Sequence, residues 1–288
     1  MSYSVIHEKW DQAPDHITDG FSIEITAKDI DSFPKIAKSL PPRTPVAVTF
    51  LPGESLEARL AAAVMVRELG FEPMPHFSAR RIKSHQELET MLKRMVEEAG
   101  VKRCFAIAGD PPEPEGPFAD TTSLIDTGLF EANGIIAIGV GGHPEGHPNM
   151  TNDECFEVLK SKCDNIHSRG MKPIIVTQFG FDPDAFMEWL EAVRDYGIDA
   201  PVRLGVPGPT SIPTLIKFAA RCGVSASTSV LTKYGISITK LIGTAGPDKM
   251  VDAFAAGFSE KHGRVRLHFY PFGGLTKTIE WVQEYQQK

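Results

Sequence analysis

Short apolar runs alternate with longer amphipathic stretches along nearly the whole chain. Each run has the length of a buried strand and is too short for a helix. The pattern predicts eight strands, at residues 21–25, 45–51, 72–78, 104–108, 134–140, 173–178, 202–206 and 265–270. Pro73 and Pro75 interrupt the third of these, so we expect it to be weaker than the others.

The amphipathic stretches carry signals for the start and the end of a helix. Ser84 and Thr151 are each followed three residues later by Glu, the spacing of a capping box, and Gly100 ends its helix. Asp29 is the expected cap of the first helix. The predicted helices are 29–39, 54–69, 84–99, 121–132, 151–168, 183–196, 212–221, 247–261 and 279–287, and residues 225–242 have room for one more.

This alternation of strands and helices indicates an α/β fold in which right-handed crossovers join parallel strands. Closing eight such units gives a (β/α)8 barrel, the architecture that we predict, and 288 residues suffice for one. A doubly wound open sheet is the alternative, but no Gly-rich dinucleotide fingerprint follows the first strand. We expect a single barrel domain at 21–288, preceded by a loose lead-in at 1–20.

Composition and charge narrow the class of protein. The chain has 42% hydrophobic and 23% charged residues, which is typical of a globular protein. A net charge of -7 gives no reason to expect nucleic acid, and the sequence has neither a bilayer-length apolar run nor a signal-peptide layout. The four cysteines form no C-x-x-C pair, so we expect free thiols in a reducing, cytoplasmic setting.

Candidate chemistry gathers where the predicted strands end. The stretch K-R-C-F-A-I-A-G-D-P-P places Asp110 directly after a buried strand, where Gly109 frees the backbone and two prolines stop the strand. Any one polar residue at such a place is explained by a turn or a cap. In a barrel the strand ends share one rim, so together they predict one site from Glu24, Thr49, His76, Asp110, His143, Gln178 and His268.

Glu24 is the sharpest candidate, because it lies between Ile23 and Ile25 with no neighbouring cation. If its side chain points into the barrel mouth, burial favours the neutral carboxyl, and a neutral carboxyl suits a general acid. Alternation along the strand allows an outward, solvated glutamate equally well.

Two further stretches could contact a ligand. Gln178 has an amide that both donates and accepts, as a heterocycle with alternating N–H and C=O groups requires, and Phe181 follows it. Phe218 on a later helix either stacks on an aromatic ring or packs in the core with Leu215.

The stretch G-V-G-G-H-P-E-G-H-P-N contains His143 and His147. Its proline keeps the histidines off a helix, so it lacks the H-E-x-x-H form and we expect no metal. The glycines let backbone approach a ligand, and the amino end of the helix at 151–168 could hold a phosphate.

At these residues the chain resembles the methylenetetrahydrofolate reductase family, which are flavin-dependent (β/α)8 barrels. The matching pieces follow the family's order from Phe21 to Tyr270: F-S-I-E, V-A-V-T-F, P-H-F-S, A-G-D-P-P, H-P-E-G-H-P-N, L-K-S-K-C-D, I-V-T-Q-F-G-F-D and H-F-Y. The resemblance implies an enzyme of one-carbon metabolism and methionine biosynthesis, often a homo-oligomer. Hydride would pass from NADH or NADPH through a non-covalent FAD to methylenetetrahydrofolate, giving 5-methyltetrahydrofolate.

The resemblance also implies roles for individual residues. Glu24 matches the acid that helps to open the five-membered ring of the folate, and Asp110 matches an aspartate near the flavin and the pterin. Gln178, Phe181 and Phe218 fall at positions for folate or nicotinamide. The positions that contact the flavin are matched by Thr49, His76, Ala108, Gly109, Asp110, His143, His147 and Lys162.

The chain departs from the family where the FAD phosphates would be held. Ala108 and Ser161 stand where the family usually has arginines, His143 replaces a tyrosine and Thr214 a glutamine. Losing two cations should weaken the hold on FAD, because charge-assisted contacts are the strong ones. Two other functions therefore stay open: the same chemistry run as methyltetrahydrofolate oxidation in one-carbon catabolism, and a flavin-poor folate-binding paralogue.

Overall fold

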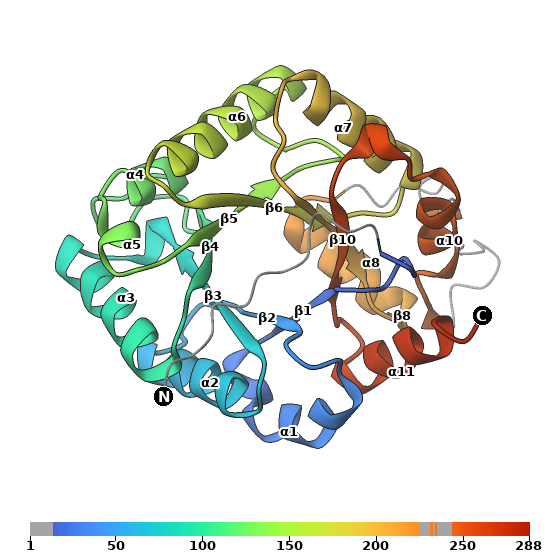
Figure 1. Cartoon of the computed structure of the whole chain (residues 1–288), viewed down its shortest axis with the longest axis horizontal. Helices are drawn as coiled ribbons and strands as arrows, with labels where there is room; N and C mark the ends of the chain where they lie inside the picture. The colour runs from blue at the N-terminus through green and yellow to red at the C-terminus, as the bar shows by residue number, and fades with distance from the viewer. Residues whose placement is uncertain (1–13, 225–230, 233, 235–243) are drawn as a thin grey trace. The chain divides into compact units, whose positions relative to one another are not determined.

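A computed structural model describes residues 14–224, 231–232, 234 and 244–288 (Figure 1). Its barrel strands are β1 (Ser22–Ile25), β2 (Pro45–Val48), β3 (Glu72–Ser78), β4 (Arg103–Ile107), β5 (Ala137–Gly142), β6 (Lys172–Phe179), β7 (Val202–Pro207) and β10 (Val265–Tyr270). These eight parallel strands close in the order β1-β10-β7-β6-β5-β4-β3-β2, which confirms the predicted (β/α)8 barrel. The extra helix considered at 225–242 and the lead-in at 1–20 fall largely outside the described residues.

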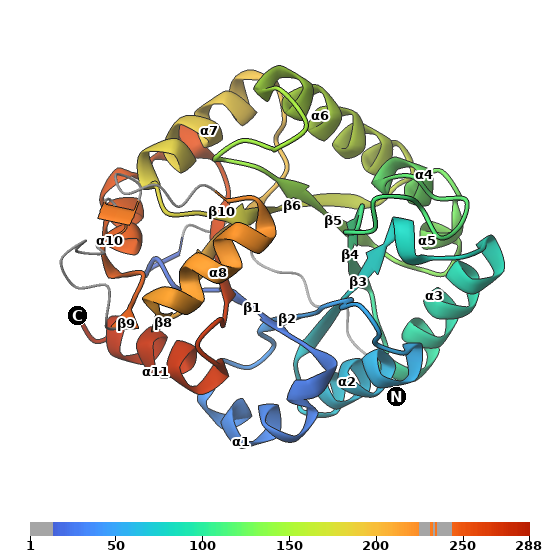
Figure 2. The ribbon, with the colours of Figure 1, turned by 180° about the vertical axis from the view of Figure 1, so that it is seen from behind.

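The helices are α1 (Phe33–Ile36), α2 (Leu56–Glu68), α3 (His85–Ala99), α4 (Thr121–Ile125), α5 (Leu129–Ala132), α6 (Asn152–Ser168), α7 (Pro183–Asp195), α8 (Ile212–Cys222), α10 (Asp248–Gly257) and α11 (Leu275–Tyr285). Short 3₁₀ helices η1 (Ala27–Asp31), η2 (Ala37–Ser39), η3 (Ala79–Arg81) and η4 (Glu260–His262) join some of them. Outside the barrel sheet, β8 (Thr210–Ser211) pairs antiparallel with β9 (Thr244–Ala245) (Figure 2).

Internal contacts divide the chain into two compact parts. The described residues of the first part are 24–141 and 161–175, and those of the second part are 14–23, 142–160 and all those after 175. In the first part, β2, β3 and β4 pair in sequence and α2 and α3 lie outside them (Figure 1). In the second part, β10 pairs with β7 along its whole length and with β1 at Ser22 and Ile23.

One guanidinium holds several elements of the first part together. Arg67 on α2 donates from Nη1 to Glu72 Oε1 at 2.8 Å, which ties the helix to the start of β3. The same side chain donates to the carbonyl oxygens of Ala99 and Gly100, at 3.2 and 3.0 Å, and so satisfies the last carbonyls of α3.

β3 forms over all the residues predicted for the third strand, in spite of the two prolines that led us to expect a weaker one. All seven of its residues are buried, and it pairs with both β2 and β4. Pro73 and Pro75 are two residues apart, so both lack a donor on the same side of the strand and the N–H groups facing the other neighbour remain.

The prediction of one continuous helix at 121–132 is wrong, because α4 and α5 are separate helices. The Thr127 hydroxyl donates to the Leu124 carbonyl oxygen at 2.7 Å, and Gly128 takes a positive φ of 72° that a continuous helix cannot contain.

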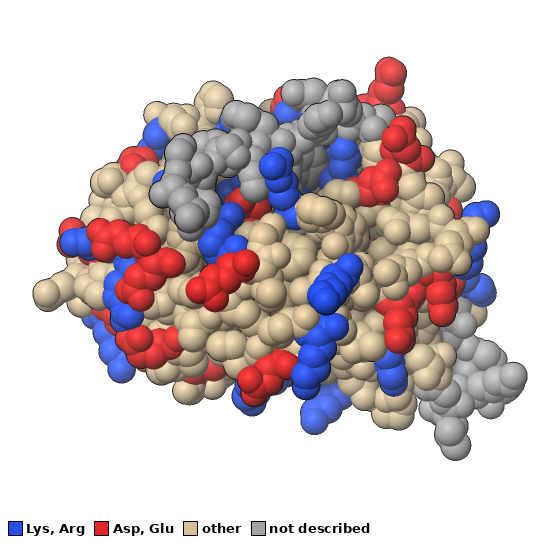
Figure 3. Space-filling view, turned by 60° about the horizontal axis from the view of Figure 1, so that its bottom comes forward, with Lys and Arg blue, Asp and Glu red and all other residues tan. Residues whose placement is uncertain are grey.

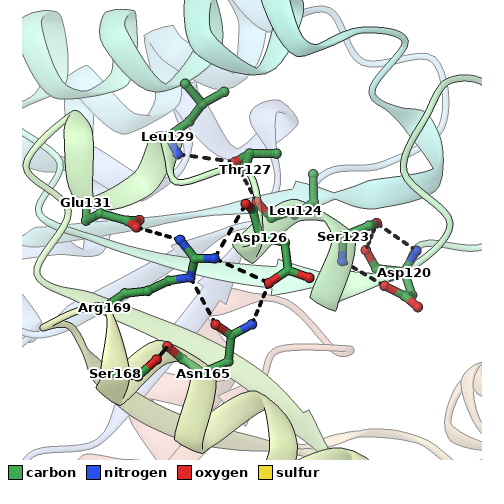
Figure 4. A network of polar contacts seen from close by, with 10 residues as sticks. All are labelled: Asp120, Ser123, Leu124, Asp126, Thr127, Leu129, Glu131, Asn165, Ser168 and Arg169. Carbon is green, nitrogen blue, oxygen red and sulfur yellow. Dashed lines mark hydrogen bonds and ion pairs between the residues drawn. The ribbon is translucent and has the colours of Figure 1, made fainter.

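A polar network fixes the break between α4 and α5 (Figure 4). Arg169 donates from Nη1 to Glu131 on α5 at 2.9 Å and from Nε to Asn165 on α6 at 2.9 Å. The amide of Asn165 donates to Asp126 Oδ1 at 2.8 Å, so the turn between the two short helices is anchored on α6.

The helix predicted at 29–39 is divided into η1, α1 and η2, with Thr26 rather than Asp29 as the first cap. The Asp29 carboxylate accepts from the Thr26 N–H at 2.8 Å, so Asp29 is the third residue of a capping box. Pro34 lies in the first turn of α1, where its missing N–H removes no helical hydrogen bond but ends the preceding turn.

On the face drawn in Figure 3, acidic and basic side chains are interspersed rather than gathered by sign. Among the helices described, none combines the length and the apolar character that a membrane crossing requires.

Candidate functional site

Glu24 is largely buried on β1. Its neighbours Ile23 and Ile25 are 0% and 1% exposed, and the Glu24 side chain itself is 19% exposed. Glu24 Oε2 lies 3.7 Å from His76 Nε2 on β3, within the first part. Of the two orientations that the sequence allowed, the solvated one is therefore excluded.

Burial raises the pKa of the Glu24 carboxyl above its ordinary value, and the nearby His76 offsets part of that rise. The cause is desolvation, because a charge removed from water costs more than a neutral carboxyl does. Glu24 therefore keeps its proton at higher pH than a solvated glutamate, as a proton donor near neutral pH must.

Two buried hydroxyls lie at the ends of β2 and β3. Thr49 and Ser78 are 6% and 1% exposed, and neither side-chain oxygen has a hydrogen-bond partner among the described residues. The Thr49 N–H donates to the Ile25 carbonyl oxygen at 3.0 Å, which fixes its backbone next to β1. Because an unpaired buried hydroxyl costs free energy, these two are suited to bind a ligand atom. The sequence pattern P-H-F-S contained Ser78, which was not singled out there.

Gly109 follows β4 and must be glycine. Its φ is +93°, and a Cβ built there would lie 2.1 Å from the Ser78 hydroxyl. The N–H of Arg80 donates to the Ala108 carbonyl oxygen at 2.9 Å, so the loop after β4 is held against η3. The backbone at Ala108 and Gly109 thus closely approaches the end of β3.

Asp110 is exposed and paired. Its side chain is 62% exposed, and Oδ1 accepts from Nε and Nη2 of Arg81 at 3.0 and 2.5 Å. A carboxylate held by a guanidinium keeps a fixed direction, so Arg81 orients the group that the sequence singled out.

Lys162 lies half-buried on α6, in the first part. The amino end of α6, expected as a phosphate site, belongs to the second part and already has an anionic cap. Glu154 Oε2 accepts from the N–H and the hydroxyl of Thr151 at 2.7 and 2.9 Å, which confirms the predicted capping box.

In the second part, the H-P-E-G-H stretch forms a turn with two contacting rings. The rings of His143 and His147 lie 4.8 Å apart at 77°, and His147 Nδ1 accepts from the N–H of Asn149 at 3.2 Å. Within the described ranges, no three His, Cys, Asp or Glu side chains are arranged to hold a metal ion.

Gln178, near the end of β6, is held by the backbone. Its Oε1 accepts from the N–H of Phe179 at 3.1 Å. The preceding Thr177 accepts the Tyr270 hydroxyl on its carbonyl oxygen at 2.9 Å and the Gly205 N–H on its own hydroxyl at 2.8 Å. The next residue of β6 and two neighbouring strands, β7 and β10, therefore restrict where the Gln178 amide can point.

Aromatic rings gather in the second part. Phe181 is fully buried, with its ring 5.3 Å from that of Tyr234. Phe218 is only half-buried, whereas Leu215 on the same helix is fully buried, and the Phe218 ring stacks on Phe272 at 4.1 Å and 13°. No sequence pattern pointed to Phe272, whose position depends on the turn after β10.

His268 on β10 is buried as a neutral imidazole. Its Nδ1 lies 2.8 Å from the Ser22 hydroxyl. Burial, together with the nearby Arg203, lowers the pKa of His268 to about 3. His268 therefore stays neutral near pH 7 and does not exchange a proton there. Its protonation gives no support to the prediction that His268 belongs to the site at the strand ends.

A closed α/β barrel with a proton-retaining carboxyl and unpartnered hydroxyls at its strand ends belongs to a class dominated by enzymes. The family model described as methylenetetrahydrofolate reductase matches residues 30–270. The chain therefore belongs to the methylenetetrahydrofolate reductase family.

The chain is 33% identical to methylenetetrahydrofolate reductase 2 of Saccharomyces cerevisiae over 133 residues, 43% of this chain and 21% of that protein. It is 25% identical to 5,10-methylenetetrahydrofolate reductase of Pectobacterium carotovorum over 207 residues, 70% of this chain and 65% of that protein. The chain thus spans less than two thirds of the length of either relative. A dihydropteroate synthase structure from Thermus thermophilus covers 95% of this chain, with 94% of its own length, at a TM-score of 0.53 and 13% identity, which indicates a shared fold.

Proposed function

We propose that the chain reduces 5,10-methylenetetrahydrofolate to 5-methyltetrahydrofolate, with hydride from NADH or NADPH carried by a non-covalent FAD. Family membership over residues 30–270 and the barrel support this proposal. The observation that carries it is Glu24, a buried carboxyl with a raised pKa on the first barrel strand.

Glu24 is the proposed acid. Opening the five-membered ring of the folate turns a ring nitrogen into a leaving group, and protonation makes it a better one. Because burial raises the pKa of this carboxyl, it keeps a proton to donate at higher pH than a solvated glutamate, which is almost fully ionised at pH 7. His76, at 3.7 Å, offsets part of the rise in the pKa of Glu24.

The residues present fit FAD better at its ring than at its phosphates. The unpartnered hydroxyls of Thr49 and Ser78 offer hydrogen bonds, and Gly109 lets backbone approach. At the phosphates, the matched positions supply one cation, Lys162, beside Ser161. When bound, FAD would supply the two-electron carrier between the nicotinamide and the folate. We therefore expect FAD to bind, but less tightly than where two arginines assist.

The remaining roles are proposed residue by residue. The fixed amide of Gln178 suits the paired donors and acceptors of a pterin. The half-buried ring of Phe218 suits stacking with a nicotinamide or a pterin, and Asp110 would accept from the pterin or hold the flavin.

Flavin uptake and turnover of the purified chain test the proposal. We expect added FAD to bind with a shifted visible spectrum, NADH or NADPH to bleach it without oxygen, and methylenetetrahydrofolate to restore it as methyltetrahydrofolate forms. A chain that takes up no FAD and forms no methyltetrahydrofolate would contradict the proposal.

A second candidate is a folate-binding barrel with little flavin, favoured by Ala108 and Ser161 at the phosphate positions. Tight folate binding with no nicotinamide-dependent turnover, even in excess FAD, would identify it. Initial rates measured from methyltetrahydrofolate with an electron acceptor would show whether oxidation is the faster direction.

A further inference from the structure

The H-P-E-G-H stretch contains a glutamate, Glu145, to which the proposed function gives no role. Glu145 Oε1 accepts two backbone N–H groups, from Phe181 at 2.5 Å and from Asp182 at 2.8 Å. Both belong to the segment between β6 and α7, and all these residues lie in the second part. Hydrogen bonds to a carboxylate are stronger than neutral ones, so Glu145 fixes this segment firmly.

The fit between Glu145 and this segment leaves no spare room. A Cβ on Gly180 would lie 2.5 Å from Glu145 Oε1 and 2.6 Å from the Phe186 ring. Gly180 is therefore a glycine because the carboxylate occupies the space beside it. The Q-F-G-F-D sequence and the glutamate of the other stretch are matched to each other.

The segment that Glu145 fixes also sets the direction of Gln178. Gln178 Oε1 accepts from the N–H of Phe179, only two residues before the first N–H that Glu145 binds. The side before Gln178 is held separately, by the contacts of Thr177 with Tyr270 and Gly205. Glu145 thus holds the backbone on the C-terminal side of Gln178.

We infer that Glu145 is a positioning residue: its carboxylate holds the backbone at 179–182 so that the Gln178 amide keeps the direction needed to bind the folate pterin. This inference rests on the proposed function, which gives Gln178 its ligand. Glu145 needs no contact with the substrate. It acts through the segment, since a displacement of about 1 Å at a binding group can cost about 100-fold in rate.

The test compares Glu145→Ala, Glu145→Gln and Gln178→Ala in the full chain, with folate and nicotinamide half-reactions measured separately. We expect Glu145→Ala to raise the KM for methylenetetrahydrofolate about 10- to 100-fold and to leave flavin reduction by NADH unchanged. Glu145→Gln should keep most of the affinity, because an amide oxygen still accepts both N–H groups. In the Gln178→Ala background, Glu145→Ala should change the KM less than about twofold, since neighbouring residues in one network are not additive.

Glu154→Ala is the matched control, because Glu154 also accepts backbone and hydroxyl hydrogen bonds at a helix start in the same part. It should leave the folate KM unchanged. A Glu145→Ala variant that loses only thermal stability, as Glu154→Ala would, or whose effect adds fully to that of Gln178→Ala, overturns the inference.

A crystal structure of Glu145→Ala separates this inference from the proposed function. We expect the 3.1 Å contact between Gln178 Oε1 and the Phe179 N–H to be lost in the variant. A variant that retains this contact overturns the positioning role whatever the kinetics show. Absence of folate turnover in the native chain would instead count against the proposed function alone.

Discussion

The strand ends of the first part carry groups whose charge matters, whereas those of the second part carry groups whose orientation matters. In the first part, burial favours the protonated form of Glu24, and Arg81 pairs with the Asp110 carboxylate. In the second part, the Phe179 N–H fixes the direction of the Gln178 amide, and burial keeps His268 neutral, so that His268 takes no part in proton transfer near pH 7. We therefore expect changes in the first part to alter proton transfer to the substrate, and changes in the second part to alter how well a ligand fits.

The largest expected effect is that of Glu24→Gln, which keeps the shape of the side chain and removes its transferable proton. We expect the folate half-reaction to slow about 100- to 10,000-fold, because general acid catalysis contributes that much. Flavin reduction by NADH should be nearly unchanged, as single-turnover absorbance would show. Glu131→Gln, which alters a carboxylate bound to Arg169, is the control. Equal loss of both half-reactions would remove the distinction between the two parts.

Gly109→Ala tests whether the first part also depends on close backbone fit. The φ of +93° and the contact with Ser78 should together lower the free energy of unfolding by about 2 to 4 kcal/mol, measured in urea. Gly53→Ala is matched, because Gly53 has a φ of +79° and open space around its Cβ position. A loss equal to that of Gly53→Ala would mean that the Ser78 contact contributes nothing.

His268 should make stability depend on pH in the opposite sense from Glu24. Its pKa is about 3 in the folded chain, against 6.5 for an ordinary histidine, so the unfolded chain binds more protons between these values. The stability it contributes is present above pH 6.5 and is lost as pH falls toward 3, at about 1.4 kcal/mol per pH unit. His268→Asn should flatten this slope in pH-dependent unfolding, while Ser22→Ala should not. An unchanged slope in His268→Asn would show that other groups cause it.

Phe218→Leu should give the smallest effect and should act only on binding. Losing an aromatic stack costs about 0.5 to 1.5 kcal/mol, so the KM of the stacked substrate should rise about 2- to 12-fold. The folate half-reaction should keep the same pH profile as in the native chain, because Glu24 is unchanged. Phe258→Leu, in the stacked pair with Phe254, is the control. A shifted pH profile in Phe218→Leu would show that proton chemistry and ligand fit are not divided between the two parts.

The fold was predictable because the strand pattern depends on local composition. Every barrel strand lies within a few residues of its predicted position, including β10 at Val265–Tyr270. The errors have both local and distant causes: the helix at 29–39 is divided by the Thr26 cap and Pro34, which the sequence already contains, whereas the turn at Gly128 is also held by side chains of another segment. Asn165 and Arg169, which anchor that turn, are distant in sequence, and no periodicity at 121–132 contains that information.

For the candidate site, the sequence predicts which residue types lie at the strand ends, but not which side chains or backbone groups they contact. The sequence allowed Glu24 to be either buried or solvated. Only the packing around β1, whose neighbouring side chains are buried, decides that Glu24 is buried. Arg81 as the partner of Asp110, and Glu145 as the anchor of the segment after Gln178, join loops from different βα units. Such pairs depend on how loops meet in space, which alternation along one strand cannot show.

The contact between Phe218 and Phe272 has a thermodynamic consequence for any planar ligand. The two rings cover one face of each other, and the Phe272 N–H is bound to the Tyr270 carbonyl oxygen at 2.8 Å, so only the side chain can move aside. A planar ligand that stacks on that face of Phe218 displaces the Phe272 ring, so one aromatic contact replaces another. Calorimetry should then record a heat-capacity change smaller than the area of the incoming ring suggests, because part of the apolar surface was already out of water.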